Sequence, residues 1–356
     1  MKKSLLILYN KVWSYRVDIF NLLNDKYDLT VAYTDKEFLG KSYNFKTLYT
    51  PGFKIGPFII HYNNLHRIAK RFDVVIGLHD VRWLSLMVLS ILKRKYKLIY
   101  WGIGVTAGYE NKFDSKQTWN NVRFFISRKA DALIFYRDYP LRKYIENGFD
   151  SRKLFVDFNT VAVSMLSADN PQLRQNFLFI GTLYKQKNIE ILLDAYIDLT
   201  KLRADVPKLH IIGGGPMEND IRQTITDNKL TDKVIVHGPI YDQNVLKNYF
   251  SESIVCISPN QAGLSVLTSM GYGVPYLTSK DAYTGGEIFN IEDRVTGLIY
   301  QGGKEELTQS LVWIIDNKNK MLEIGRNARA HYSLKRRPEH MAGSIINAVE
   351  YTLSIK

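Results

Sequence analysis

The chain has 356 residues, of which 46% are hydrophobic and 23% are charged, a composition typical of a globular protein with two domains. The single cysteine, Cys256, lies in an apolar run and cannot form a disulfide within the chain, so the cysteine content gives no sign of an oxidising compartment. No apolar stretch approaches the roughly 18 residues that a membrane span requires, and the apolar run behind Lys2 and Lys3 is too short for a signal peptide.

Positive charge is concentrated in the first half of the chain. Residues 1–168 contain 27 Lys and Arg against 14 Asp and Glu, whereas residues 169–356 contain 21 of each, so the whole excess of +13 lies in residues 1–168. Such asymmetry predicts an anionic partner: a phospholipid surface, a lipid diphosphate or a nucleic acid. A solvated basic surface without a partner is the alternative.

Two basic clusters in this half favour a membrane surface. Residues 61–71 combine basic and apolar side chains in a pattern typical of an amphipathic interfacial helix, and residues 93–97 form a second basic run. No nucleic-acid-binding module accompanies them. We therefore expect peripheral binding to an anionic membrane and no binding of nucleic acid.

Taken in chain order, the first half alternates short buried strands with helices. Strands are expected over residues 5–9, 29–33, 74–77, 98–100 and 132–135, and helices over 15–24 and 81–94. A polar linker follows at 164–175. The second half repeats the alternation, with strands at 177–180, 210–212, 234–236 and 254–257 and helices at 189–199, 217–228, 243–250 and 264–271. Helices continue from residue 304, with a break at 336–338 and a last helix over 338–354. Strand-helix alternation predicts doubly wound parallel α/β sheets.

Four segments of the second half have the composition of a phosphate-binding sheet edge. The first strand runs into a basic turn that ends at Lys187, the second ends in Gly213-Gly-Gly215, and the third ends in His237-Gly238. The fourth strand is followed by residues 258–275, which contain Gly263-Leu-Ser265 at a helix start. Glycine turns that open helices are how α/β sheets hold phosphorylated nucleotides. A solvated helix-start lysine and ordinary strand ends are the structural alternatives.

The order of these segments resembles the nucleotide-sugar half of family 4 retaining glycosyltransferases, which have two Rossmann-like domains facing each other across a cleft (the GT-B fold). The resemblance covers essentially the whole chain. It implies an acceptor-binding domain over residues 1–165, a donor-binding domain over 166–335, and a C-terminal helix over 336–356 that returns to the first domain.

The resemblance also implies a set of donor-binding residues. Lys187 would contact the diphosphate, and Lys185 would supply a second charge because Thr182 stands where the family has an arginine. Asn260 and Thr268 occupy the places of two glutamates that contact sugar and ribose, and Glu287 is the acidic candidate to replace them. Lys187, Glu287 and Asn260 are thus the catalytic candidates. The full expected donor site is Gly181, Thr182, Lys185, Lys187, Gly213, Gly214, His237, Gly238, Asn260, Gly263, Leu264, Ser265 and Thr268.

In the first domain the resemblance implies acceptor-side residues at strand ends and at the first helix. Ile103 stands where the family has a histidine, so one polar group is missing there. The hinge is expected at Asn159-Thr160. The expected acceptor side comprises Tyr15, Arg16, His79, Trp101, Gly102, Tyr136 and Arg137. A lone buried histidine is more often structural, which is the alternative for His79.

Together these features predict a retaining glycosyltransferase that moves a sugar from a nucleotide diphosphate donor to a lipid-linked glycan in bacterial surface-polysaccharide synthesis, at the inner face of the cell membrane. No cofactor or metal is expected, because the chain has no Asp-x-Asp motif and Lys187 offsets the leaving-group charge. Two alternatives remain: a nucleotide-sugar epimerase of the same fold, and an inactive partner subunit, which the loss of both glutamates would favour.

Overall fold

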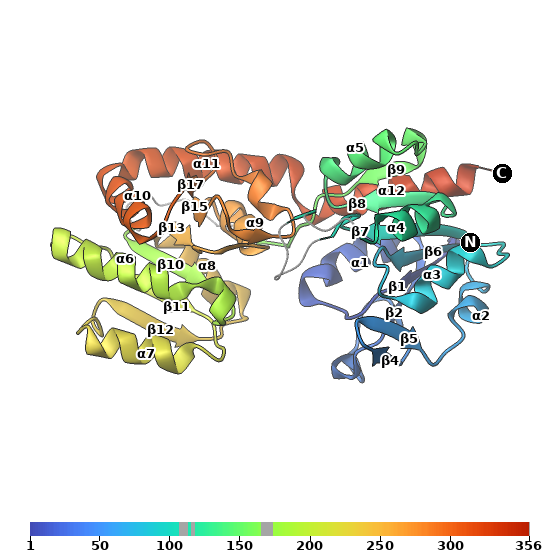
Figure 1. The fold of residues 1–356 in the computed structure, drawn as a ribbon, viewed down its shortest axis with the longest axis horizontal. Coiled ribbons are helices and arrows are strands. Elements are labelled where there is room, and N and C mark those ends of the chain that lie inside the picture. The colour runs from blue at the N-terminus through green and yellow to red at the C-terminus, as the bar shows by residue number, and fades with distance from the viewer. Residues whose placement is uncertain (107–112, 115–117, 165–173, 356) are drawn as a thin grey trace. The chain divides into compact units, whose positions relative to one another are not determined.

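The computed structural model describes residues 1–106, 113–114, 118–164 and 174–355. The chain forms two compact units (Figure 1): the first comprises Met1–Ala107, Asp114–Thr160 and Arg337–Lys356, and the second comprises Gly108–Phe113 and Val161–Arg336. Most of the predicted linker, residues 165–173, lies outside the described residues.

The first unit is built on a parallel sheet. In the described residues, seven strands are ordered β3-β2-β1-β6-β7-β8-β9 and every neighbouring pair is parallel. Because both faces of the sheet are covered, the central strands are continuous apolar runs. Their bounds are β1 Ser4–Leu8, β2 Asp28–Tyr33, β3 Lys46–Tyr49, β6 Val74–Leu78, β7 Lys97–Gly102, β8 Ala132–Phe135 and β9 Leu154–Val156.

Helices cover the two faces of this sheet. One apolar cluster joins the sheet to α1 (Ser14–Lys26) and to the C-terminal helix α12 (Pro338–Ser354), which pack against each other. The other joins it to α2 (Leu65–Ala69), α3 (Leu84–Ile91), α4 (Asn120–Arg128) and α5 (Asp138–Glu146). An antiparallel hairpin of β4 (Gly52–Ile55) and β5 (Phe58–His61) lies outside the main sheet, and short 3-10 turns occupy Lys36–Phe38 and Ser151–Lys153.

The amphipathic helix predicted over residues 61–71 is wrong. His61 ends strand β5 and is buried, and α2 spans only five residues, Leu65–Ala69. The side chain of Asn64 accepts a hydrogen bond from the backbone N–H of Arg67 at 3.0 Å and so fixes a late helix start. The basic and apolar residues that suggested one helix therefore belong to a strand end, a helix cap and a single helical turn.

The second unit repeats the architecture. In the described residues, six parallel strands are ordered β12-β11-β10-β13-β15-β17, with a separate parallel pair β14-β16. Apolar clusters lie on both faces. The strands are β10 Asn176–Ile180, β11 Leu209–Ile212, β12 Val234–Gly238, β13 Ser253–Ile257, β14 Gln261–Ala262, β15 Tyr276–Ser279, β16 Tyr283–Thr284 and β17 Leu298–Tyr300. The helices are α6 Ile189–Leu202, α7 Glu218–Asp227, α8 Gln243–Ser251, α9 Ser265–Gly271, α10 Lys304–Asp316 and α11 Lys318–Lys335, with 3-10 turns η4 Lys185–Lys187 and η5 Glu287–Asn290.

The predicted fold class, doubly wound parallel α/β sheets, is confirmed. The strands that the sequence missed are β3, β4, β5, β9, β15, β17 and the pair β14–β16. Most of them are edge, hairpin or very short strands, but β15 is fully buried between β13 and β17. Among the described helices, none combines the length and apolar character needed to cross a bilayer.

Candidate functional site

Interlocked glycine turns form the carboxyl edge of the second sheet. The N–H of Gly181, after β10, donates to the carbonyl of Ile212 at 3.0 Å, and the N–H of Gly213, after β11, donates to the carbonyl of Gly238 at 2.8 Å. Gly213 has a φ of +151°, and a Cβ at this position would lie 1.9 Å from the carbonyl oxygen of Gly181. Only glycine fits there, and the edge exposes backbone where a ligand can approach closely.

The amine of Lys187 lies over these turns. Its Nζ is 3.0 Å from the position that a Cβ on Gly181 would take, and the residue is only 6% exposed. No described acceptor pairs with the amine. Burial lowers the lysine pKa to about 8. Lys187 is therefore not the solvated helix-start lysine of the structural alternative. The turn η4 directs its side chain inward, whereas Lys185 and Gln186 in the same turn are exposed.

A second loop is fastened to this lysine turn. The Nδ2 of Asn260 donates to the carbonyl of Gln186 at 3.0 Å, and the hydroxyl of Tyr184 donates to Oε1 of Gln261 at 2.7 Å. The structure thus brings the predicted residues Asn260 and Lys187 into one region. Tyr184 and Gln261 were not predicted, because a tyrosine and a glutamine in turns carry no motif that marks them.

The segment Gly263–Ser265 has an accessible backbone at Gly263, and the hydroxyls of Ser265 and Thr268 next to it already take part in hydrogen bonds. A Cβ on Gly263 would meet nothing within 4 Å. The hydroxyl of Ser265 is 2.8 Å from that of Tyr276, and the hydroxyl of Thr268 donates to the carbonyl of Leu264 at 3.2 Å. In this structure the hydroxyl of Thr268 is bonded within its own helix, and the backbone of Gly263 is the part of the turn that a ligand can approach.

Glu287 is a buried carboxylate at the start of η5. It is 7% exposed, and the hydroxyl of Thr284 lies 3.5 Å from its Oε2. The same hydroxyl accepts hydrogen bonds from the N–H groups of Gly286 and Ile288 at 2.9 and 3.2 Å. Thr284 therefore organises the turn that carries the carboxylate, which the sequence placed correctly after a strand.

Both ring nitrogens of His237 already have hydrogen-bonding neighbours. Its Nε2 is 2.8 Å from Nδ1 of His210, and its Nδ1 is 3.1 Å from the hydroxyl of Tyr249. Burial lowers the pKa of both histidines. The backbone at this strand end, including Gly238, remains a candidate for the expected role. Of the remaining predicted donor residues, Thr182 is exposed and Gly214 packs near Pro239.

In the first unit, the predicted acceptor-side residues gather around a buried arginine. The guanidinium of Arg16 lies 5.2, 4.9 and 5.3 Å from the ring centres of Tyr15, Trp101 and Tyr136. Its nitrogens donate to the hydroxyl of Tyr136 at 3.1 Å and to Sδ of Met341 at 2.9 Å. At 1% exposure Arg16 cannot touch an acceptor, so the expectation that it faces a cleft is corrected.

A buried carboxyl belongs to the same region. Asp157, after β9, is fully buried, and neither of its carboxylate oxygens has a hydrogen-bond partner. Burial raises the pKa of Asp157 well above its usual range, while the charge of Arg16 acts in the opposite direction. Sequence analysis did not expect a buried carboxyl beside Arg16.

His79 is a core histidine. Its Nε2 lies 2.8 Å from the hydroxyl of Ser127 and 3.4 Å from that of Tyr144, and burial lowers its pKa to about 3. The ring is neutral at physiological pH and stacks on Tyr100 at 5.7 Å. Gly102 packs tightly beside it, since a Cβ there would lie 3.1 Å from that of His79. Arg137 precedes α5 and is partly exposed.

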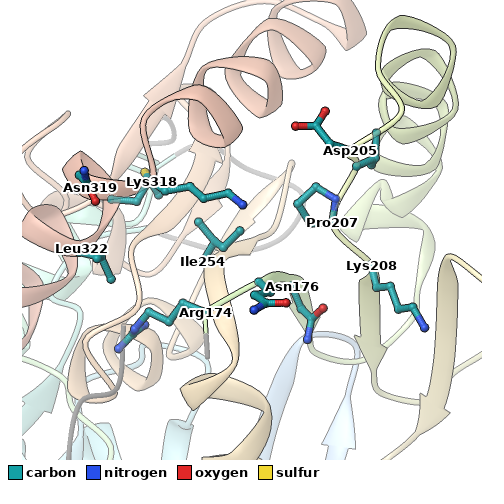
Figure 2. Close-up of a pocket in the computed structure, with 12 residues that line it drawn as sticks. Arg174, Asn176, Asp205, Pro207, Lys208, Ile254, Lys318, Asn319 and Leu322 are labelled. Atoms are coloured by element: carbon teal, nitrogen blue, oxygen red, sulfur yellow. The ribbon is translucent and has the colours of Figure 1, made fainter. Parts of the chain in front are cut away.

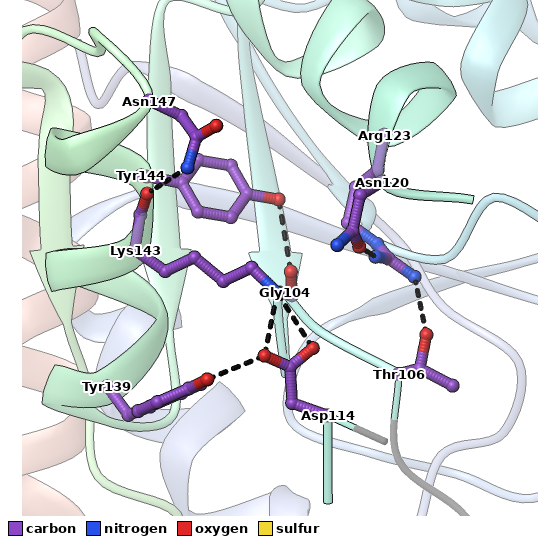
Figure 3. A network of polar contacts seen from close by, with 9 residues as sticks. All are labelled: Gly104, Thr106, Asp114, Asn120, Arg123, Tyr139, Lys143, Tyr144 and Asn147. Atoms are coloured by element: carbon purple, nitrogen blue, oxygen red, sulfur yellow. Dashed lines mark hydrogen bonds and ion pairs between the residues drawn. The ribbon is translucent and has the colours of Figure 1, made fainter. Parts of the chain in front are cut away.

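A polar network lies beyond β7 (Figure 3). The ammonium of Lys143 contacts both carboxylate oxygens of Asp114 at 2.9 and 2.6 Å, and the hydroxyl of Tyr139 donates to the same carboxylate at 2.7 Å. The N–H of Asp114 donates to the carbonyl of Thr106 at 2.7 Å, so the network is joined to the residues that follow β7. Sequence reasoning missed it because its members are spread over three separate segments.

A pocket of about 620 Å³ occurs at the opposite edge of the second sheet (Figure 2). It is lined from the amino ends of β10, β11 and β13 and from the start of α11, by residues that include Arg174, Lys208, Ile254 and Lys318. It is thus remote from the glycine turns. The described residues contain no cluster of three or more His, Cys, Asp or Glu that could hold a metal ion.

Comparison with known proteins agrees with this geometry. Residues 168–331 match the family model described as "Glycosyl transferases group 1". An uncharacterised glycosyltransferase of Methanocaldococcus jannaschii is 22% identical over 325 residues, which is 83% of this chain and 81% of that protein. An α-monoglucosyldiacylglycerol synthase of Streptococcus pneumoniae is 27% identical over 130 residues, 36% of this chain and 29% of that protein. Anabaena HepE, solved in complex with UDP, superposes with a TM-score of 0.74 at 16% identity over 98% of this chain and 99% of that one.

The fold is therefore that of the GT-B glycosyltransferases, with two Rossmann-like domains. The matched model covers the unit that holds the glycine turns and Lys187. The chain is a glycosyltransferase with this fold, and its residues 168–331 resemble the group 1 model.

Proposed function

We propose that this enzyme is a retaining glycosyltransferase that transfers a sugar from a nucleotide diphosphate to a lipid-linked glycan, at the inner face of a bacterial membrane, for surface-polysaccharide synthesis. The observation that carries the proposal is the amine of Lys187, which is nearly buried, has no described partner and lies over the glycine turns after β10 and β11. A buried ammonium without a counter-ion is a preformed site for an anion.

The donor site is proposed around that amine. The diphosphate would lie against Lys187 and the open backbone at Gly263, with the exposed Lys185 adding charge. The complex of HepE with UDP supports a nucleotide diphosphate as the ligand. Positive charge that is already positioned stabilises the negative charge that develops on the leaving diphosphate. We propose that the lysine, rather than a metal ion, supplies this stabilisation.

The proposed chemistry retains the configuration of the sugar. The bond between the anomeric carbon and the diphosphate oxygen breaks, and the acceptor oxygen bonds to the same face of that carbon. The acceptor proton passes to the departing phosphate oxygen, so no nucleophilic side chain is needed. Glu287 and Asn260, both near the turns in the fold of the second unit, are the proposed contacts to the sugar.

The lipid-linked acceptor is proposed on two grounds. The whole excess charge of +13 lies in residues 1–168, which suits an anionic bilayer or a lipid diphosphate. The streptococcal relative is named for a glucosylated diacylglycerol, a lipid product.

A donor panel tests the proposal. The purified chain is incubated with nucleotide sugars of different base and sugar, with and without a lipid-linked acceptor and with and without EDTA. We expect slow sugar release from one donor without acceptor, faster transfer with acceptor, no effect of EDTA, and a product of retained anomeric configuration by NMR. An epimerised donor would instead establish the epimerase alternative, and no turnover with any donor would favour an inactive subunit.

A further inference from the structure

We infer that one face of the first unit, formed by α3, α4 and the β4–β5 hairpin, is the surface that docks on an anionic bilayer. This deepens the membrane location proposed above and rests on it. We call this surface the α3–α4 face. Its large exposed apolar side chains are Ile55, Val88, Ile91, Leu92, Trp119, Val122 and Phe125.

These side chains form stripes rather than scattered points. On α3, Val88 and Ile91 are three residues apart, with exposures of 45% and 60%. Before and on α4, Trp119, Val122 and Phe125 follow at three-residue steps, with Phe125 53% exposed. Residues three apart lie on one side of a helix. Each helix therefore turns an apolar stripe outward while its other side packs on the sheet through Leu86, Leu89, Phe124 and Ile126.

The two stripes and the hairpin are contiguous. Helices α3 and α4 contact each other (Figure 1). The guanidinium of Arg94 joins their ends, since it donates to the carbonyl of Ser90 at 3.2 Å and to that of Lys129 at 2.6 Å. At the other end of α4, the ring of Trp119 packs edge-on against Phe58 of the hairpin at 5.8 Å. The exposed residues thus belong to one surface.

The charge of this face is of one sign. The three segments that build it, residues 52–61, 84–97 and 118–130, contain eight basic residues and no Asp or Glu. In the described residues, five of the eight are exposed and have no carboxylate partner: Lys54, Lys93, Lys95, Arg128 and Lys129. The ammonium of Lys129 lies 5.9 Å from the ring of Phe125, so positive charge adjoins the apolar stripe directly. Asp131, just beyond α4, is held by Arg94 at 3.2 Å.

This combination favours a bilayer over other occupants. An apolar stripe beside unpaired lysines suits a membrane interface, where side chains enter the acyl boundary and ammonium groups meet lipid phosphates. A second copy of the chain would bring two positive faces together. An anionic leaflet attracts each nearby basic residue, so five lysines and arginines with a few apolar contacts give reversible binding. The face also includes the predicted basic cluster at residues 93–97, of which Lys93 and Lys95 are exposed.

Vesicle co-sedimentation of the full chain tests this surface. The probes are vesicles of phosphatidylcholine with about one third phosphatidylglycerol, and vesicles of phosphatidylcholine alone. We expect salt-sensitive binding to the anionic vesicles. Ile91→Ser with Phe125→Ser should weaken it about tenfold or more, from two lost insertions. Lys93→Gln, Lys95→Gln and Lys129→Gln together should weaken it about 100-fold, from three lost charge contacts.

Matched controls lie on the second unit. Leu202→Ser with Leu334→Ser removes two side chains of equal or greater exposure, and Lys208→Gln, Lys229→Gln and Lys318→Gln remove the same charge. These should bind vesicles as the parent does. Unchanged binding by the serine variant, or equal losses in the controls, would overturn the inference. Binding of the full chain to an acidic protein, with no binding to either kind of vesicle, would also overturn it.

Nucleotide binding and donor hydrolysis, measured on the same variants without lipid, separate this inference from the proposed function. Intact hydrolysis with lost vesicle binding supports the docking face. Vesicle binding by an enzyme that fails to glycosylate any lipid-linked acceptor would instead count against the proposed acceptor and leave the face standing.

Discussion

Replacing Lys187 by methionine should stabilise the ligand-free protein and remove its response to nucleotide. Methionine keeps an unbranched apolar chain in the buried space but removes the ammonium. Burial lowers the pKa of this lysine from 10.5 to about 8. Since each pKa unit corresponds to about 1.4 kcal/mol, the charged lysine opposes folding by up to about 3 kcal/mol at neutral pH. We expect Lys187→Met to raise the free energy of unfolding by about 1–3 kcal/mol at pH 7.

The sign of the pH dependence follows from the same shift. Between pH 8 and pH 10.5 the unfolded chain keeps the proton on this lysine, whereas the folded chain has released it. The unfolding free energy of the parent protein therefore rises with pH across this window. The methionine variant lacks that rise, so the difference between the two proteins should shrink as the pH approaches 10.5.

Urea denaturation at pH 7 and pH 10, with and without UDP, GDP, ADP or dTDP, measures both effects. A nucleoside diphosphate that stabilises the parent should not stabilise the variant, and turnover should fall about 100-fold, the scale of losing one preorganised charge contact. Lys185→Met is the matched control, because Lys185 is exposed in the same turn and should leave apo stability unchanged. A Lys187→Met protein that is less stable at pH 7 and still responds to the nucleotide would refute this reasoning.

Four further substitutions test the two units. Gly213→Ala should lower the free energy of unfolding in urea by about 3 kcal/mol or more, because its Cβ would collide with the Gly181 carbonyl at 1.9 Å. A Cβ on Gly263 would meet nothing within 4 Å, so Gly263→Ala should fold normally and weaken nucleotide binding about tenfold. Equal stability of the two variants would contradict this. Glu287→Gln should slow use of the donor sugar in a transfer assay and leave nucleoside diphosphate binding nearly intact, and a parallel loss of both would mark Glu287 as structural. Asp157→Asn should raise the free energy of unfolding at pH 7. The parent protein has a carboxyl whose pKa is raised by folding, so its stability falls as the pH rises above the pKa of the unfolded chain. The gain should therefore vanish below about pH 4 in a series of denaturation curves at different pH.

Many helices and strands of this fold can be predicted from short local patterns in the sequence. Continuous apolar runs such as 132–135 predict strands covered on both faces, and the break at Pro338 predicts the start of the last helix, because a proline suits the first helical turn and interrupts a longer one. The glycines at 213–215 likewise marked a place where backbone must approach backbone. The sequence misplaced residues 61–71, where basic and apolar residues at helical spacing are divided between a strand and one helical turn.

What a side chain faces was decided only by tertiary structure. Lys187 and Arg16 are both basic residues near helix starts, and the sequence does not predict that either is buried. Packing buries Lys187 over a glycine edge and Arg16 among three aromatic rings. The burial of Asp157 and the exposed apolar stripes of α3 and α4 could not be predicted from the sequence for the same reason. Local pattern fixes the period and ends of an element, but burial, and with it pKa, depends on which distant elements pack against it.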